Sequence, residues 1–140
     1  MKFDLKDPYH QAIIPIGLIL LFHISLKMAW ILGLIGVENP QHYWISMFAI
    51  VMVFIMFNPI IGLGAQNTNL YIGKSSTAFI VIILLGSLST YLNTNEFLVQ
   101  KPEMKAMYIV LTVGFLVFTS IIGLMKAVVE WSKQSDEKHR

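Results

Sequence analysis

Four long apolar runs constrain this sequence more than any other feature. They cover residues 12–37, 43–64, 77–97 and 105–129. A helix needs about 20 mostly apolar residues to cross the hydrocarbon core of a bilayer, and the connections between these runs are short. The sequence therefore predicts an all-α, polytopic membrane protein. Its four spans are expected to form an up-down-up-down transmembrane four-helix bundle, as a single domain over residues 1–140.

Composition and charge narrow the class of protein further. Only 13% of the residues are charged, against about 25% in a typical soluble domain, which excludes a disordered chain and argues against a water-soluble globule. The chain has no cysteine, so disulfides, thiol catalysis and cysteine-bound metal clusters are excluded. A formal charge of +2 is too small to favour nucleic-acid binding. The expected partner is the lipid bilayer, with no nucleic acid.

Helix-capping residues mark the starts of the spans. Asp7 and Asn39 are each followed by a proline, which places a capping side chain before a proline at the first helical position. The serines at positions 75 and 76 offer a cap for the third span. The polar stretch 65–76 is then expected to form the loop between the second and third spans.

The placement of the basic residues predicts the orientation. With four spans, the N-terminus, the second connection and the C-terminus share one side of the membrane. That side carries seven basic residues: Lys2, Lys6, Lys74, Lys126, Lys133, Lys138 and Arg140. The other side carries Lys101 and Lys105. The positive-inside rule therefore predicts a multi-pass protein of the cytoplasmic (inner) membrane with both termini in the cytoplasm. Residues 131–140 are expected to be a short charged cytoplasmic tail without a fold of its own.

His23 and Lys27 are the polar pair that lies well inside a span. Their spacing of four places both on one face of the first helix, and His23 lies about 16 Å from the start of the span at 1.5 Å per residue. The functional interpretation is a proton-relay or anion-contacting pair that lines a polar path. In the alternative, Lys27 extends to the outer interface near Trp30, and His23 bonds to a hydroxyl group of another helix. Both interpretations stay open.

Hydroxyl side chains of other spans complete a candidate polar intramembrane site around His23. At the depth of His23 the third span offers Ser87, Ser89 and Thr90, and the fourth offers Thr119 and Ser120. The candidate site is assigned to His23, Lys27, Ser87, Thr90 and Thr119. No acidic residue lies at these depths, and the nearest carboxylates are those of Glu38 and Glu96 at the outer edge. Lys27 therefore reaches one of these two carboxylates, is partly neutral, or takes an anionic partner from a lipid, a ligand or another subunit.

Small residues form two stripes that predict close helix packing. One stripe follows the first span: Ser25, Ala29 and Gly33. The other follows the fourth span: Thr119, Gly123 and Ala127. Small side chains let membrane helices approach closely. The contact is expected within the bundle or, alternatively, with another copy or a partner subunit.

Asn58 and Pro59 interrupt the second span. A proline inside a helix removes one backbone hydrogen bond and bends the helix, so we expect a kink near the cytoplasmic end of this span. A broken membrane helix can also mark a ligand site.

No catalytic motif or cofactor site is readable in the sequence. The segment at 73–75 (Gly-Lys-Ser) resembles the end of a phosphate-binding loop, but Thr68 stands where that loop needs its first glycine. His10, His23 and His42 differ in depth, which argues against a haem held within one chain. No His, Asp and Glu cluster suits zinc, and no acid orients His23 for nucleophilic catalysis. We therefore predict no catalytic residues, no metal and no cofactor.

The segment Gly17 to Lys27, with the sequence GLILLFHISLK, resembles the first helix of DoxX-like proteins. That family consists of four-helix membrane proteins, some of which are associated with oxidoreductase complexes. The resemblance covers one helix of the four. It implies a four-helix membrane fold and assigns no functional residue.

Together these features favour a small integral membrane protein that acts as a non-catalytic subunit or scaffold of a larger membrane assembly. Its partners would be other membrane subunits or further copies of itself. One alternative is a small transporter or channel in which His23 and Lys27 line a polar path. Another is an accessory subunit of a membrane oxidoreductase. An enzyme with its own catalytic machinery ranks last, because no catalytic set is readable.

Overall fold

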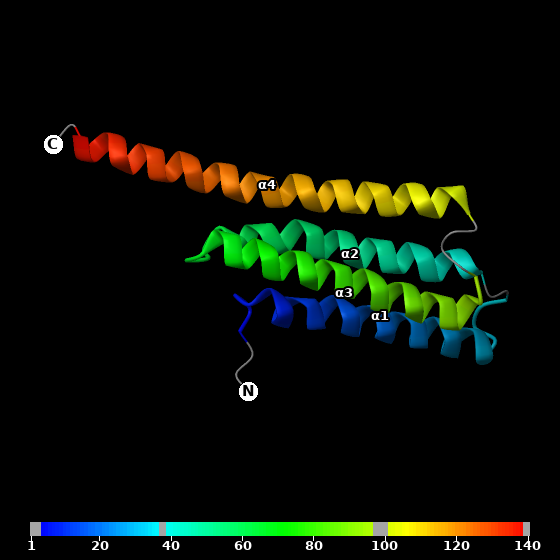
Figure 1. Cartoon of the computed structure of the whole chain (residues 1–140). Coiled ribbons are helices and arrows are strands. Elements are labelled where there is room, and N and C mark those ends of the chain that lie inside the picture. Colours follow the sequence, from blue (N-terminus) through cyan, green and yellow to red (C-terminus); the bar gives the residue numbers. More distant parts are fainter. Residues whose placement is uncertain (1–3, 37–38, 97–100, 139–140) are drawn as a thin grey trace.

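The computed structural model describes residues 4–36, 39–96 and 101–138, with side chains up to residue 135. Its regular structure consists of four helices (Figure 1): α1 (Pro8–Ile31), α2 (Pro40–Gly62), α3 (Thr68–Thr94) and α4 (Pro102–Lys138). Each helix is long and apolar enough to cross a membrane. The predicted all-α class with four candidate spans is therefore confirmed over the described residues.

The first two helices begin where the capping signals predicted. The carboxylate of Asp7 accepts a hydrogen bond from the backbone N–H of Tyr9, and the Asn39 side chain accepts one from Gln41. In both helices a proline occupies the first turn, where the missing N–H would have no helical partner in any case. Local sequence alone therefore sets these two boundaries.

The first helix ends earlier than its apolar run. Gly33 adopts a left-handed conformation with φ of 70°, and the N–H of Leu34 then donates to the carbonyl oxygen of Ala29 at 2.9 Å. This glycine-dependent motif closes a helix by satisfying its last carbonyl groups. The span predicted to continue to about residue 37 therefore stops at Ile31, and residue 37 lies outside the described part of the chain.

The third helix begins earlier than predicted. Its cap is Asn67, whose side chain accepts a hydrogen bond from the N–H of Leu70 at 3.1 Å, so the serines at 75 and 76 do not cap it. Ser75 lies inside α3 and is fully buried. The polar stretch 65–76 is consequently helical for most of its length, because its buried face packs against other helices.

The fourth helix continues beyond the apolar run that predicted it. It extends through most of the expected tail to Lys138 (Figure 1). The tail therefore prolongs α4 rather than forming a separate extension. Its backbone hydrogen bonds are local, so a charged and exposed sequence can continue a helix that the span has already nucleated.

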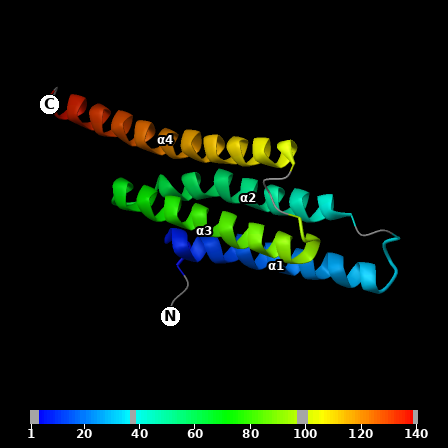
Figure 2. The same cartoon turned by 45° about the vertical axis from the view of Figure 1, so that its right-hand side comes forward.

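The second helix lies at the centre of the packing. In its most apolar stretch 44% of the residues are buried, against 22% in α1 and in α4. α1 packs against α2 and α3, whereas α4 packs chiefly against α2, and α1 and α4 lie on opposite sides (Figures 1 and 2). The core is built around large α2 side chains: Trp44, Met47, Phe48, Val51, Phe54 and Ile55.

Polar contacts tie the ends of the helices together. Lys74 in α3 forms an ion pair with Asp7 before α1 at 3.1 Å, and Lys126 in α4 donates to the carbonyl oxygen of Ala65 after α2. At the opposite end, Lys101 pairs with Glu96 at 2.8 Å. The start of α1, the start of α3 and the end of α2 therefore share one end of the structure.

Candidate functional site

His23 lies on the face of α1 that packs against α2 and α3, and only 1% of it is exposed. Its Nδ1 atom is 2.8 Å from the Ser89 hydroxyl oxygen and its Nε2 atom is 3.1 Å from the Tyr43 carbonyl oxygen. A carbonyl can only accept, so Nε2–H donates to Tyr43 and, in the neutral ring, Nδ1 accepts from Ser89. Both ring nitrogens are therefore bonded, and His23 joins three helices.

Lys27 is half-buried, one turn further along α1. Its Nζ atom lies 5.0 Å from the centroid of the Trp30 ring, a cation–π distance. Of the two carboxylates considered for it, Glu96 pairs with Lys101, and Glu38 lies outside the described residues. The His23 ring and the Lys27 ammonium group thus have different surroundings, although both come from one face of α1.

The other predicted hydroxyl groups do not gather around His23. Ser87 hydrogen-bonds to the hydroxyl of Tyr108 at 2.7 Å. Thr90 donates to the carbonyl of Gly86 in its own helix, and Thr119 does the same with Phe115. Buried threonine hydroxyls in helices commonly use this bond four residues back. The hydroxyl group that contacts His23 belongs to Ser89, which lies at the same depth on α3 but is not one of the residues predicted for the site.

The two stripes of small residues lie largely at the surface. Ser25 is exposed and bonds to the carbonyl of Leu21 in its own helix, Ala29 is half-buried, and Gly33 lies past the end of α1. On α4 the exposure of the stripe increases along the helix: Thr119 is buried, Gly123 is half-buried and Ala127 is exposed. Their role in close packing stays a prediction.

A second buried polar cluster was not predicted as a site. It consists of Gln11 in α1, Asn58 in α2 and Tyr71 in α3, which are 5%, 1% and 5% exposed. The Asn58 Nδ2 atom donates to Gln11 Oε1 at 2.7 Å, and the Tyr71 hydroxyl donates to the Asn58 carbonyl oxygen at 2.7 Å. Like His23, this cluster joins α1, α2 and α3.

One backbone carbonyl fixes the orientation of both side-chain amides in this cluster. Gln11 Nε2 donates to the carbonyl oxygen of Leu5 at 2.8 Å, so the Gln11 amide cannot be turned the other way. Gln11 Oε1 must then accept from the Nδ2 group of Asn58. This order leaves Asn58 Oδ1 buried without a hydrogen-bond partner among the described residues.

Gly62 makes room for the Tyr71 ring. A Cβ atom added at Gly62 would overlap that ring and would lie 2.9 Å from the Cδ1 atom of Ile122. The absence of a side chain lets α3 and α4 meet the end of α2 here. The Tyr71 hydroxyl can then reach the Asn58 carbonyl.

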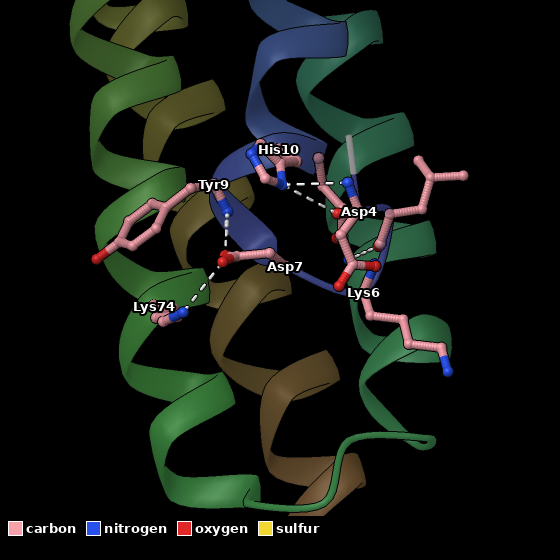
Figure 3. A network of polar contacts seen from close by, with 8 residues as sticks. Asp4, Lys6, Asp7, Tyr9, His10 and Lys74 are labelled. Atoms are coloured by element: carbon pink, nitrogen blue, oxygen red, sulfur yellow. Dashed lines mark hydrogen bonds and ion pairs between the residues drawn. The ribbon is translucent and has the colours of Figure 1, made fainter. Parts of the chain in front are cut away.

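A charged contact closes the same end of the structure (Figure 3). Asp7 faces both the N–H of Tyr9 and the ammonium group of Lys74. Burial favours the neutral carboxyl group, but these two donors outweigh burial and hold the pKa of Asp7 below its ordinary value. Asp7 therefore caps α1 and links it to α3 at once.

The sequence carried a weak signal for the missed cluster. Gln11 lies on the stripe of α1 that also holds Pro15, Ile19 and His23, and all four are buried. A neutral amide near a span end resembles an interfacial residue, so its burial is not evident from composition. Asn58 was singled out only because it precedes Pro59. α2 continues as a helix through Pro59, and the expected kink stays a prediction.

Two open grooves adjoin the buried polar residues of α1. One groove of about 290 Å³ lies between α1 and α3 beside His23 and Ser89. The other, of about 230 Å³, lies between α1 and α2 beside Gln11 and Asn58. Within the described ranges, no three His, Asp or Glu side chains gather as metal ligands. These sites offer hydrogen bonding and apolar contact.

Comparison with known proteins found no matching family model, no matching curated protein and no matching solved structure. The resemblance of residues 17–27 to the first helix of DoxX-like proteins gains no support from these comparisons. Function is therefore argued from the geometry of the chain itself.

Proposed function

We propose that this chain is a multi-pass protein of the cytoplasmic membrane that acts as a non-catalytic subunit of a larger membrane assembly. In this proposal the four helices cross the bilayer in alternating directions. The observation that carries it is the open surface of α4 around Gly123, where an added Cβ would meet nothing within 4 Å in this chain. Glycine weakens a helix by about 1 kcal/mol relative to alanine, and membrane helices use small residues where another helix approaches.

The small residues of α1 and α4 support the same proposal. Ser25 is exposed and Ala29 is half-buried on α1, and on α4 Gly123 is half-buried and Ala127 is exposed. Two helices on opposite sides of the chain thus present small residues outward. Helix association in lipid depends on close packing, so such surfaces suit a partner helix.

The charges at one end support the proposed orientation. Lys74 and Lys126 lie with Asp7 and Ala65 at the end that holds the starts of α1 and α3. At the other end lie Lys101 and Lys105, so the proposed orientation depends on the number of basic residues at each end and not on their ion pairs. An excess of lysine on one side is typical of the cytoplasmic face. Both termini would then be cytoplasmic.

The test is the size of the assembly after mild detergent extraction from native membranes. Wild type should migrate well above the 15.9 kDa chain with its detergent, and co-purifying proteins or differently tagged copies identify the partner. Gly123→Leu should release the monomer. Gly114→Leu is the matched control, because it also meets nothing within 4 Å and lies about 180° around the same helix. A wild-type chain that is monomeric in native membranes contradicts the proposal.

A membrane oxidoreductase is one assembly in which the chain would be an accessory subunit. Redox cofactors in the co-purified complex would identify this case. The alternative of a small transporter or channel rests on Lys27, which is half-buried inside α1. Lys27→Met should abolish flux in proteoliposomes if Lys27 lines a polar path, and unchanged flux removes His23 and Lys27 from that mechanism.

A further inference from the structure

Lysines and apolar side chains meet in a groove between the end of α2 and α4. The groove has a volume of about 340 Å³, and six residues line it: Leu63, Met125, Lys126, Val129, Glu130 and Lys133. The residues at 126, 129, 130 and 133 share one face of α4, because helix neighbours recur after three or four positions. α4 extends past the other helices at this end (Figure 1), and the groove is open to its surroundings.

The depth of this groove matches the surface of a bilayer. Lys105 and Lys126 are 21 positions apart on α4, with no charged residue between them, which is about 32 Å at a rise of 1.5 Å per residue. A bilayer has a hydrocarbon core about 30 Å thick, so in the proposed membrane arrangement the two lysines lie at its two boundaries. Lys133 is two turns further out, but side chains on a helix lean toward its N-terminus. Both lysines of the groove can therefore reach the layer of lipid phosphate groups.

The groove carries one excess positive charge. Its lining consists of two lysines, one glutamate and three apolar residues. The ion pairs among the described side chains lie elsewhere, so neither Lys126 nor Lys133 is paired with a carboxylate there. Lys126 donates to the neutral carbonyl group of Ala65, which leaves its charge uncompensated and two of its three donors available. An anion therefore suits this groove.

A second groove at the same end of the structure has no such excess. It has a volume of about 390 Å³, and its charged lining residues are two lysines and two aspartates: Lys6, Lys74, Asp4 and Asp7. Lys74 pairs with Asp7 at 3.1 Å, so the charges of this groove balance within the described chain. Of the two, the groove beside α4 is the one that favours an anion.

The apolar walls select the kind of anion. Leu63, Met125 and Val129 are 39%, 49% and 52% exposed, and covering such surface is favourable. A small soluble anion leaves these side chains uncovered, whereas the acyl chains of a lipid cover them. A phospholipid with one net negative charge also balances the excess charge of the groove, which a zwitterionic lipid does not. Basic pockets beside membrane helices are typical sites for anionic head groups.

We propose that the groove between α2 and α4 binds an anionic phospholipid. Its phosphate group contacts Lys126 and Lys133, its acyl chains cover Leu63 and Met125, and Glu130 weakens the attraction without cancelling it. The proposal rests on the membrane crossing of α4 and is independent of subunit contact. The two can fail separately: a chain that does not insert into nanodiscs contradicts the crossing, and an inserted chain without lipid preference contradicts this site.

The test compares photoactivatable phospholipids that differ only in the head group. Phosphatidylglycerol and phosphatidylcholine, each with a diazirine near the start of one acyl chain, are added in equal small amounts to phosphatidylcholine nanodiscs that hold the full chain. Phosphatidylglycerol should label residues 125–133 about fivefold more, the effect of one net charge at an anionic lipid surface. Equal labelling by the two lipids, or stronger labelling by a phosphatidylethanolamine probe, overturns the proposal.

Charge variants locate the site. Lys126→Gln and Lys133→Gln should each lower the phosphatidylglycerol labelling of residues 125–133 about fivefold, and Glu130→Gln should raise it about fivefold. Lys133 and Glu130 are exposed, so their variants keep the fold even if Lys126→Gln does not. Undiminished labelling of Lys133→Gln overturns the proposed contact.

Two controls separate this groove from general attraction of anions. Lys105→Gln removes the same charge from the same helix at the other boundary and should leave the labelling of residues 125–133 unchanged. A loss as large as that of Lys133→Gln would mean that overall charge attracts the lipid, which contradicts the proposal. Inorganic phosphate should displace the probe no better than sodium chloride of equal ionic strength. Stronger displacement would identify a soluble anion as the ligand and contradict the lipid assignment.

Discussion

Gln11 and His23 lie on one face of α1, and each links this helix to α2 and α3 through buried hydrogen bonds. Gln11 is 5% exposed and His23 is 1% exposed. At His23 both ring nitrogens are bonded. At Gln11 the network ends with the Asn58 Oδ1 atom, which has no partner among the described residues. We call the contact of His23 with Tyr43 and Ser89 the closed joint, because its hydrogen bonds are complete. We call the cluster of Gln11, Asn58 and Tyr71 the open joint, because one of its acceptors has no partner among the described residues.

The difference is not evident from the kinds of residue involved. A histidine inside a membrane span looks functional because charged and titratable groups are rare there. Here its hydrogen bonds are all made within the chain. The neutral amide of Asn58 attracts less attention in a sequence, yet its buried Oδ1 atom has no partner among the described residues. The two networks therefore differ in whether their hydrogen bonds are complete, a difference that the sequence does not reveal.

The largest expected effect comes from Gly62, on which the open joint depends. Gly62→Leu should destabilise the protein by about 1–3 kcal/mol or more, because its side chain would overlap the Tyr71 ring and crowd Ile122. Thermal unfolding in detergent measures this. Gly73→Leu is the control, since an added Cβ meets nothing within 4 Å there. Equal melting temperatures for the two variants would show that Tyr71 does not pack on Gly62.

The next effect distinguishes the two amides of the open joint. Gln11→Leu removes the partner of Leu5, of Tyr71 and of the Asn58 amide, and should cost about 2–3 kcal/mol. Asn58→Leu removes the donor to Gln11 but at the same time removes the costly unpartnered Oδ1 atom. Its net cost should therefore be smaller, about 1 kcal/mol. Comparison of the two unfolding curves in detergent tests this order. The reverse order would mean that Asn58 Oδ1 has a partner in the folded protein.

A smaller effect is expected at the closed joint. Ser89→Ala removes one of the two bonds of His23 and should destabilise the protein by about 0.5–1.5 kcal/mol, because the net contribution of one hydrogen bond is modest. Ser120→Ala is the control, because Ser120 is exposed and bonds only to Leu116 of its own helix among the contacts described. Indistinguishable unfolding of the two variants would show that the His23–Ser89 bond contributes nothing to stability.

Local rules predicted much of the fold. The number of helices follows from apolar runs, and the caps at Asp7 and Asn39 follow from their side chains. The misplaced ends have local causes as well. Gly33 ends α1 in a left-handed conformation, and Asn67 caps α3 where serines further along were expected to do so. Hydropathy alone does not separate a turn from a span when both are apolar.

The sites depended on contacts that a single sequence does not contain. Spacing placed His23 on an inward face, but the choice of Ser89 over Ser87 and Thr90 depends on how α3 is rotated. The pairing of Gln11 with Asn58 joins residues 47 positions apart. It also depends on Gly62, whose role appears only when the Tyr71 ring is in place.

The smallest effect concerns the charged contact beside the open joint. Asp7→Asn keeps an oxygen to cap α1 but loses the charge facing Lys74, so it should destabilise the protein by about 0.5 kcal/mol at pH 7. The pKa of Asp7 is lower in the folded chain than its ordinary value of 3.8. Its stabilising effect is therefore present above that value and is lost as the pH falls through the lower folded pKa. Unfolding of wild type and Asp7→Asn in detergent at pH 7, 5 and 3 should show a difference that shrinks at the acidic end, and a constant difference would show that ionisation of the Asp7 carboxyl group is not its source.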